Sequence, residues 1–205
     1  HRVVKQARVL LGPTSEAAPS LFMASLDDLP SSRPRITVDT FPQKGVALGS
    51  ASVAISDYLR GIRDSVGHDL VLLPAVCILI WNDDGRLLLM QEAETLRWQT
   101  IGGMVDPDES PWDAARREAM EEAGVEVRLD RVRTALGGPG YRVYYPNGDV
   151  CSYVSTVFDA VIVSGEPGAG DDEVHRVAWF DPVEIAALDL DSANRHLLTD
   201  AGVIG

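Results

Sequence analysis

Cysteine is scarce in this chain, which has two in 205 residues, Cys77 and Cys151. They lie far apart and inside apolar stretches, which excludes a CxxC redox pair and a cysteine-rich zinc site. We expect two buried free thiols, which suit a cytoplasmic protein. Long apolar runs are also lacking in the sequence, because none approaches the roughly 20 residues that span a bilayer. We therefore expect no membrane partner.

Positive charge is scarce as well. The chain has 18 Lys and Arg against 31 Asp and Glu, which gives a net charge of -13. Such a chain repels the phosphate backbone of nucleic acids and anionic lipid, so we expect neither as a partner. Any phosphate-bearing partner would have to be bound locally, by a metal ion or by a few cationic side chains.

Residues 1–49 differ in composition from the rest of the chain. They are rich in Ser, Pro and Gly and contain one short strand candidate at residues 35–41. This composition predicts an N-terminal extension or arm. A homodimer stabilised by this arm is a hypothesis that the sequence alone does not test. Residues 50–205 have the periodic apolar patterns of a folded domain, and we expect one domain there.

The apolar pattern after residue 50 changes repeatedly between helical and extended periodicity. Two apolar runs, at residues 70–81 and 86–91, flank the turn sequence NDDG, which predicts a hairpin of buried strands. Extended segments are also expected at 98–105, 125–136, 141–145, 150–163 and 174–180, and helices at 50–66, 111–123, 182–188 and 192–199. Strands and helices do not alternate as regular βαβ units, so we expect an α/β fold with a mixed sheet flanked by helices.

The helix expected at residues 111–123 has signals at both ends. Ser110 is a suitable N-cap, and Pro111 suits the first helical position. Gly124 is a suitable stop, because glycine readily adopts the left-handed conformation that ends many helices. The sequence therefore predicts a helix over Pro111–Ala123.

Three glutamates, Glu118, Glu121 and Glu122, crowd the end of this helix within about a third of its circumference. Glu118 and Glu122 form a like-charge i,i+4 pair, which costs a few tenths of a kcal/mol, roughly, on an isolated helix. The helix dipole also disfavours negative charge at this end. A solvated acidic face is the ordinary interpretation of such a cluster. A divalent cation such as Mg²⁺ or Mn²⁺ explains it better, because oxygen ligands on adjacent turns suit a hard cation that would neutralise them.

The residues before the helix fit a metal site. Gly102 and Gly103 allow close approach of the backbone to a ligand, and a glycine carbonyl could complete the coordination. Arg117 on the helix and Glu109 before it have opposite charges, and the arginine fork could bind the carboxylate and fix the path of the loop.

The spacing of these residues resembles the signature of the Nudix hydrolases. Gly103, Glu109 and Arg117–Val125 match G-x5-E-x7-R-E-U-x-E-E-x-G-U, in which U is a bulky apolar residue. Every polar and glycine position agrees. Ala119 is small where the signature has a bulky residue, a departure that concerns packing rather than chemistry. The order of the expected elements from about residue 70 to 198 also looks like the α/β/α sandwich of that family.

The resemblance implies hydrolysis of a nucleoside diphosphate linked to another moiety, with Mg²⁺ or Mn²⁺ assisting the attack of water on phosphorus. Nucleoside triphosphates, nucleotide sugars and ADP-ribose remain open as substrates. The metal ligands implied are Glu118, Glu121, Glu122 and the Gly102 carbonyl, and the structural residues implied are Gly103, Glu109, Arg117 and Gly124. The alternative is a catalytically silent nucleotide-binding or sensing Nudix module, which would be expected to have lost ligands that are all present here.

The general base is left open by the resemblance. Some members of the family use a glutamate of the box, here Glu121 or Glu122, and others use a carboxylate from a later loop. The later acidic loop of this chain offers Asp171, Asp172 and Glu173. We favour Glu173 as the base or as an extra metal ligand, with a solvated turn as the alternative.

Candidate substrate contacts lie before the box and in the later hairpin. Four aromatic residues, Trp98, Tyr141, Tyr144 and Tyr145, could stack on a base, although packing within a strand or hairpin is the competing interpretation for each. Arg97 and Arg142 could bind phosphate.

The lead-in to the box departs twice from the common family text W-x-L-P-G-G-x-V-E-P-G-E. Ile101 stands where that text has proline, and Asp108 stands where it has glycine. We expect Ile101 to loosen the turn before the glycine pair and to alter how the base or sugar is seated.

Overall fold

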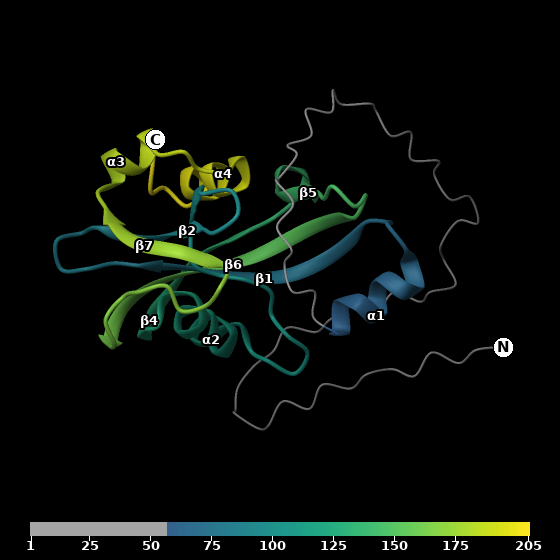
Figure 1. Ribbon diagram of the computed structural model, residues 1–205, viewed down its shortest axis with the longest axis horizontal. Coiled ribbons are helices and arrows are strands. Elements are labelled where there is room, and N and C mark those ends of the chain that lie inside the picture. The colour runs from purple at the N-terminus through teal and green to yellow at the C-terminus, as the bar shows by residue number, and fades with distance from the viewer. Residues whose placement is uncertain (1–56) are drawn as a thin grey trace, which may run out of the picture. The chain divides into compact units, whose positions relative to one another are not determined.

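The computed structural model describes residues 57–205 (Figure 1). The extension expected at residues 1–49, and the start of the helix expected at 50–66, lie outside the described residues. The helices and strands follow in the order α1 (Asp57–Val66), β1 (Val71–Ile80), β2 (Leu87–Glu92), β3 (Trp98–Gln99), α2 (Pro111–Ala123), β4 (Glu126–Leu136), the 3-10 turn η2 (Pro139–Tyr141), β5 (Arg142–Tyr144), β6 (Val150–Ser164), β7 (Val174–Phe180), α3 (Pro182–Ala187) and α4 (Ser192–Asp200). No helix of this part of the chain has the length and apolar character needed to cross a membrane.

The larger sheet is built on β6. Strand β1 pairs with it in parallel along ten residues, from Val71 opposite Cys151 to Ile80 opposite Ala160. On the other edge of β6, β5 and then β4 pair in antiparallel orientation. The hairpin predicted from residues 141–145 and 150–163 is therefore confirmed, and the larger sheet is mixed, as expected.

The hairpin predicted from residues 70–81 and 86–91 is wrong in its pairing. Both strands form, but β2 joins a second sheet of order β3-β2-β7, while β1 belongs to the first. Only one bridge, Trp81 to Leu87, connects them next to the turn. Continuous apolar runs show that two strands are buried, but not which strand each one pairs with, and β6 takes the whole length of β1.

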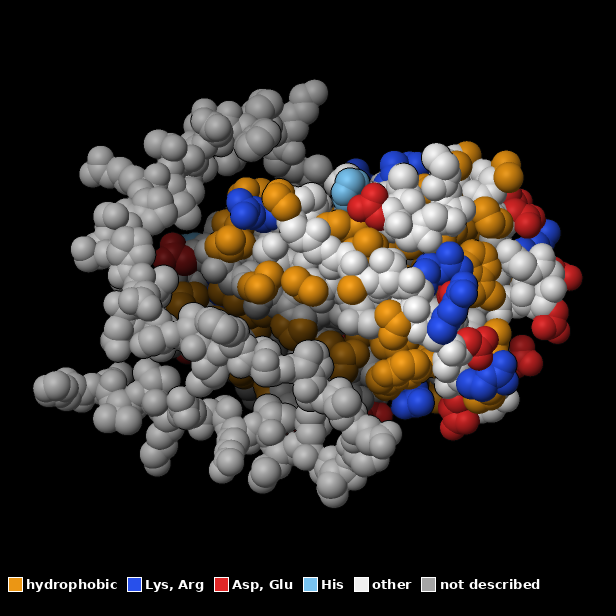
Figure 2. All heavy atoms as spheres, turned by 180° about the vertical axis from the view of Figure 1, so that it is seen from behind, with side chains coloured by type: hydrophobic (Ala, Val, Ile, Leu, Met, Phe, Trp, Pro, Cys, Tyr) orange, Lys and Arg blue, Asp and Glu red, His pale blue; other side chains and the backbone are white. Residues whose placement is uncertain are grey.

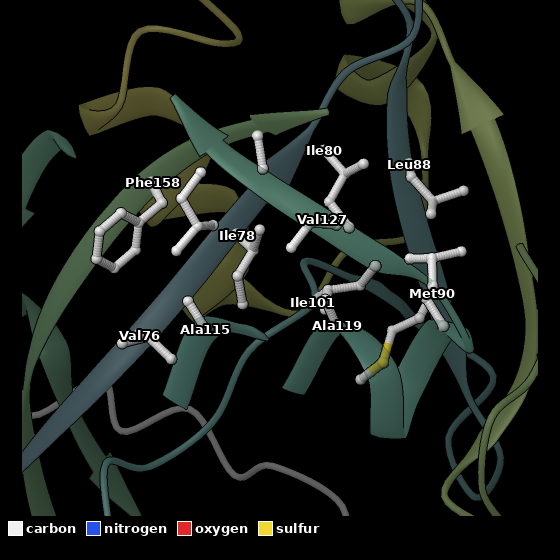
Figure 3. Close-up of a cluster of buried hydrophobic side chains, with 14 of the residues drawn as sticks. Val76, Ile78, Ile80, Leu88, Met90, Ile101, Ala115, Ala119, Val127 and Phe158 are labelled. Atoms are coloured by element: carbon white, nitrogen blue, oxygen red, sulfur yellow. The ribbon is translucent and has the colours of Figure 1, made fainter. Parts of the chain in front are cut away.

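Side chains alternate along β1 between two hydrophobic layers. Val76, Ile78 and Ile80 face the layer that contains α2, where Figure 3 shows them with Ala115 and Ala119. Cys77 and Leu79 face the opposite layer, which contains residues of α3 and α4. Figure 1 accordingly shows α2 on one side of the strands and α3 with α4 on the other. The α/β/α sandwich is confirmed.

Helix α2 lies close to the sheet because its packed face consists of small residues. Ala114, Ala115, Ala119 and Ala123 are all fully buried. The small side chain of Ala119 thus has the packing role expected of it. Trp112, at the start of the helix, is 38% exposed, and its ring contacts Phe158 edge-on, with ring centroids 4.7 Å apart.

Both cysteines are buried free thiols, as expected. Burial raises the pKa of Cys77 to about 12, which leaves the thiol protonated and unreactive. Hydrophobic side chains also reach the surface, and Figure 2 shows one face on which they lie among charged side chains.

Candidate active site

The glutamates are positioned by a helix whose ends are fixed as the sequence predicts. The Ser110 side chain accepts a hydrogen bond from the Asp113 N–H at 3.2 Å. Gly124 ends α2 in the left-handed conformation with φ 68°. Helix α2 therefore covers Pro111–Ala123. Its register buries two of the glutamates and leaves the third at the surface.

The buried pair is Glu118 and Glu122, whereas the Glu121 side chain is 51% exposed. The Gly102 N–H donates to Glu122 Oε2 at 2.9 Å. Burial raises the pKa of Glu122 well above its usual value, against the stabilising Gly102 N–H. Burial also raises the pKa of Glu118, against the hydrogen bond from Arg117. Both carboxylates thus sit where a negative charge is unfavourable without a cation.

Arg117 connects the helix to the loop before it. Its Nε and Nη2 donate to the two carboxylate oxygens of Glu109, each at 3.0 Å, and Nη2 also donates to the Met104 carbonyl at 2.9 Å. Its Nη1 donates to Glu118 at 2.7 Å and to Glu121 at 2.9 Å. The Arg117 hydrogen bonds hold the pKa of Glu109 below its usual value. One guanidinium therefore ties together the loop and two of the three glutamates.

The glycine pair allows this loop to pass between β1 and α2. Gly102 has φ 149°, and a Cβ there would lie 2.2 Å from the Val76 carbonyl oxygen. A Cβ on Gly103 would lie 2.4 Å from Glu118 Oε1. Any side chain at either position would displace the strand or the carboxylate.

The later acidic loop lies against the same helix. Its residues Asp171 and Glu173 are close enough to Glu122 for their charges to raise the Glu122 pKa further. Asp171 Oδ1 accepts the Glu173 N–H at 2.9 Å, which closes a local turn. The Glu173 carbonyl accepts the Ala93 N–H at 2.9 Å. The structure therefore brings together carboxylates that lie about 50 residues apart in the sequence.

The three glutamates of α2, Arg117, the glycine pair and the acidic loop line one cavity of about 1110 Å³. Arg97 and Arg142 line it as well, and Arg97 also lies 3.9 Å from Asp189. Trp98 does not line it, because this side chain is 6% exposed and packs edge-on against Phe180 at 4.7 Å. Tyr144 is also outside the lining. The structure thus places the two arginines at the cavity together with Tyr141 and Tyr145, but not Trp98 or Tyr144.

The described domain matches a known protein family. The model of the NUDIX domain family matches residues 71–201, more than half of the chain. This chain belongs to the Nudix family. It is a hydrolase of the Nudix type, a pyrophosphohydrolase.

Relatives of this Nudix hydrolase match somewhat less than two thirds of the chain. The nucleoside triphosphatase NudI of Salmonella agona (strain SL483) is 32% identical over 145 residues, which cover 63% of this chain and 96% of that protein. The structure of the MutT protein from Methanosarcina mazei Go1 has a TM-score of 0.55 and 21% identity, covering 65% of this chain and 95% of that chain. An ADP-ribose pyrophosphatase from Streptococcus suis 89-1591 has a TM-score of 0.51 and 21% identity, covering 64% and 87%. The two structural likenesses show the Nudix fold.

Nudix hydrolases generally need divalent metal ions, and the donor set here fits one. Within residues 57–205 no three His, Cys, Asp or Glu side chains are already arranged as a metal site. Arg117 instead places its positive charge between Glu118 and Glu121. The candidate donors are all oxygens, which hard cations prefer, and the carboxylates of Glu118 and Glu122 are buried where a cation would offset their charge.

Two features of the site were not visible in the sequence pattern. Asn194, at the start of α4, lines the cavity, and its Oδ1 accepts hydrogen bonds from the Thr100 N–H at 2.8 Å and the Thr100 hydroxyl at 2.7 Å. No local signal could have found this pair, which lies 94 residues apart. Ile101 is fully buried in the core and does not line the cavity. We expected Ile101 to alter how a substrate is seated, but the Ile101 side chain does not reach the cavity.

Proposed function

We propose that this Nudix hydrolase cleaves the diphosphate of nucleoside triphosphates, by attack of water on phosphorus with Mg²⁺ or Mn²⁺ as cofactor. One observation carries the proposal: the box glutamates and the acidic loop line a single cavity together with Arg97 and Arg142. The preference for triphosphates over nucleotide sugars and ADP-ribose rests on the similarity to the nucleoside triphosphatase NudI, which extends over nearly the whole of that protein.

The metal ligands in this proposal are Glu118, Glu121, Glu122 and the Gly102 carbonyl. A divalent cation held there supplies charge neutralisation of the diphosphate and makes water more acidic. Arg97 and Arg142 bind the phosphates that the chain's net negative charge would otherwise repel. Arg117 and Glu109 keep the loop and the helix in register through their two parallel hydrogen bonds.

Glu173 is the general base in this proposal, in preference to a glutamate of the box. Its neighbour Asp171 already uses a carboxylate oxygen to close the turn, so it is less free to accept a proton. Glu173 lines the cavity, and its negative charge contributes to the raised pKa of Glu122. A carboxylate next to the metal ligands is suitably placed to take the proton from the attacking water.

The base is tested by Glu173→Gln, with Glu166→Gln as the control. Glu166 lies in the same loop, is exposed and does not line the cavity. We expect kcat to fall by about 100-fold for Glu173→Gln, the lower end of the range for loss of a general base, and to be unchanged for Glu166→Gln. An unchanged kcat for Glu173→Gln would return the role of base to a box glutamate.

The substrate class is tested by measuring phosphate and pyrophosphate release from a panel of nucleoside triphosphates, nucleotide sugars and ADP-ribose. We expect release to require Mg²⁺ or Mn²⁺ and kcat/KM to be highest for a nucleoside triphosphate. Glu122→Gln should abolish most of the activity, whereas Glu126→Gln, just beyond the helix and exposed, should retain it. A catalytically silent nucleotide-binding module would instead bind members of the panel without turnover, and that result would overturn the proposal.

A further inference from the structure

The C-terminal end of α2 is completed by a distant loop. A helix leaves its last four carbonyls without partners in its own ladder. In α2 the Gly124 N–H reaches the Met120 carbonyl at 3.0 Å, which is a local cap. The next two bonds are not local: the Gly170 N–H donates to the Glu122 carbonyl at 3.2 Å, and the Gly168 N–H donates to the Ala123 carbonyl at 3.1 Å. The loop between β6 and β7 therefore supplies two of the missing donors (Figure 1).

The loop comes closest to the backbone of the helix itself at Gly170. A Cβ on Gly170 would lie 2.0 Å from the Glu121 carbonyl oxygen and 2.8 Å from the Glu121 carbonyl carbon. Both atoms belong to helix backbone, which cannot move aside as a flexible side chain could. At Gly168 the nearest atom to an added Cβ is the Glu166 carbonyl oxygen at 4.0 Å, so a methyl group fits there. The two glycines make similar hydrogen bonds but differ in the space around them.

The contact at Gly170 immediately precedes the acidic residues. Asp171 follows it directly and closes the turn to Glu173. Beyond that turn, the Glu173 carbonyl is held by the Ala93 N–H at 2.9 Å. The short segment that carries the acidic side chains is thus fixed at one end to the helix of the box and at the other end to the chain after β2.

We propose that Gly170 is a positioning residue for the hydrolysis. Its lack of a side chain lets the loop backbone lie directly on Glu121 and Glu122, and this contact fixes the distance from Glu173 to the metal ligands. A displacement of the order of 1 Å at a reacting group can lower a rate about 100-fold without changing the residues that do the chemistry. The inference rests on the proposed role of Glu173.

The experiment compares Gly170→Ala with Gly168→Ala in the full chain, assayed with Mg²⁺ and a nucleoside triphosphate. We expect Gly170→Ala to lower kcat by about 10-fold or more, with KM within about threefold of the original value, because the base moves while the rest of the cavity is kept. Gly168→Ala should behave like the unmodified protein. Equal kcat values for the two variants would overturn the proposal.

A combined variant separates positioning from general damage. If Gly170 acts through Glu173, Gly170→Ala combined with Glu173→Gln should be no slower than Glu173→Gln alone. Multiplying losses would show that Gly170 acts elsewhere and would contradict the proposal. A loss of activity in Glu173→Gln together with normal activity in Gly170→Ala would refute this inference and leave the proposed function standing. Normal activity in Glu173→Gln would instead show that Glu173 is not the general base, and the basis of this inference would be lost.

A second variant covers the case in which Gly170→Ala does not fold. One glycine inserted between Gly170 and Asp171 keeps the contact with the helix and lengthens its connection to Glu173. We expect the same loss in kcat, with circular dichroism and the urea midpoint as checks on folding. A folded insertion variant with unchanged kcat would show that the length of this connection does not set the rate.

Discussion

Arg117 makes five hydrogen bonds to three carboxylates and one carbonyl. Its neighbour Arg116 makes two long contacts, of 3.5 Å to the Trp112 carbonyl and 3.4 Å to Asp113, and is more exposed. The difference follows from the register of the helix, which turns Arg117 toward the loop and Arg116 toward solvent. Arg116 and Arg117 are adjacent in the sequence, but their different directions on the helix give them different roles.

Replacing Arg117 with Lys should lower the free energy of unfolding by about 2 kcal/mol, because one ammonium cannot form the paired hydrogen bonds of a guanidinium. Urea denaturation monitored by circular dichroism measures the change. Arg116→Lys is the matched control and should change stability by less than about 0.5 kcal/mol. Similar losses in both variants would show that the charge matters and the fork does not.

Asp108 has φ 66°, a left-handed conformation that favours glycine. This is the position at which the common family text has glycine, the residue that adopts this conformation without strain. Aspartate tolerates this conformation better than most residues, because its short side chain can hydrogen-bond locally.

We expect Asp108→Gly to leave the free energy of unfolding within about 1 kcal/mol of its value, and Asp108→Val to lower it by about 1–2 kcal/mol, because a β-branched residue is strained there. Thermal melts of the two variants measure the difference. A valine variant as stable as the glycine variant would show that the loop relaxes to another conformation.

At the scale of elements, the strands β4 and β6 are joined by more than their backbone. Asp159 on β6 is buried and accepts hydrogen bonds from Arg131 at 2.7 Å and Arg133 at 2.8 Å on β4. Trp81, just after β1, donates its indole N–H to the same carboxylate at 3.1 Å. Burial alone would raise the pKa of Asp159, but these donors outweigh it and hold the pKa below 3.8.

This cluster predicts a dependence of stability on pH. Because the pKa of Asp159 is lower in the folded chain than in the unfolded one, its contribution is fully present above the unfolded value near 3.8 and is lost as the pH falls through the folded value. Urea denaturation between pH 7 and pH 2.5 should show a smaller fall in stability for Asp159→Asn than for the unmodified chain. Asp130→Asn, which removes an exposed pair with Arg128, should keep the original slope. Identical slopes in all three proteins would exclude this account.

Local signals predicted some elements better than others. The bounds of α2 follow from Ser110, Pro111 and Gly124, because a helix is ended by residues within a turn of its ends. The pairing of β1 could not be predicted in the same way. Its partner β6 begins about 80 residues later, and the choice between β2 and β6 is made by packing across the whole domain.

At the scale of the whole molecule, β1 lies in the middle layer of the sandwich, but its side chains are not buried along its full length. Ile78 is fully buried between the sheet and α2, whereas Leu72, which the alternation of the strand places on the same face, is 67% exposed. Two residues on one face of β1 therefore differ in whether they belong to the core.

We expect Ile78→Ala to lower the free energy of unfolding by about 3 kcal/mol, because it removes a buried side chain and leaves a cavity. Leu72→Ala should change it by less than about 0.5 kcal/mol. Urea denaturation of both variants tests the contrast. A large loss for Leu72→Ala would mean that this end of β1 is covered in solution.

The sequence by itself determined the helix of the box, its caps and the common face of Glu118 and Glu122, because helical spacing makes residues four apart neighbours in any fold. It also indicated the family through the spacing of Gly103, Glu109 and Arg117–Val125. Only the tertiary structure decided that Trp98 packs in the core, that β1 pairs with β6, and that Gly170 lies against Glu121. These contacts join segments about 50 to 90 residues apart, and their choice depends on which surfaces the whole domain buries together, which no local spacing encodes.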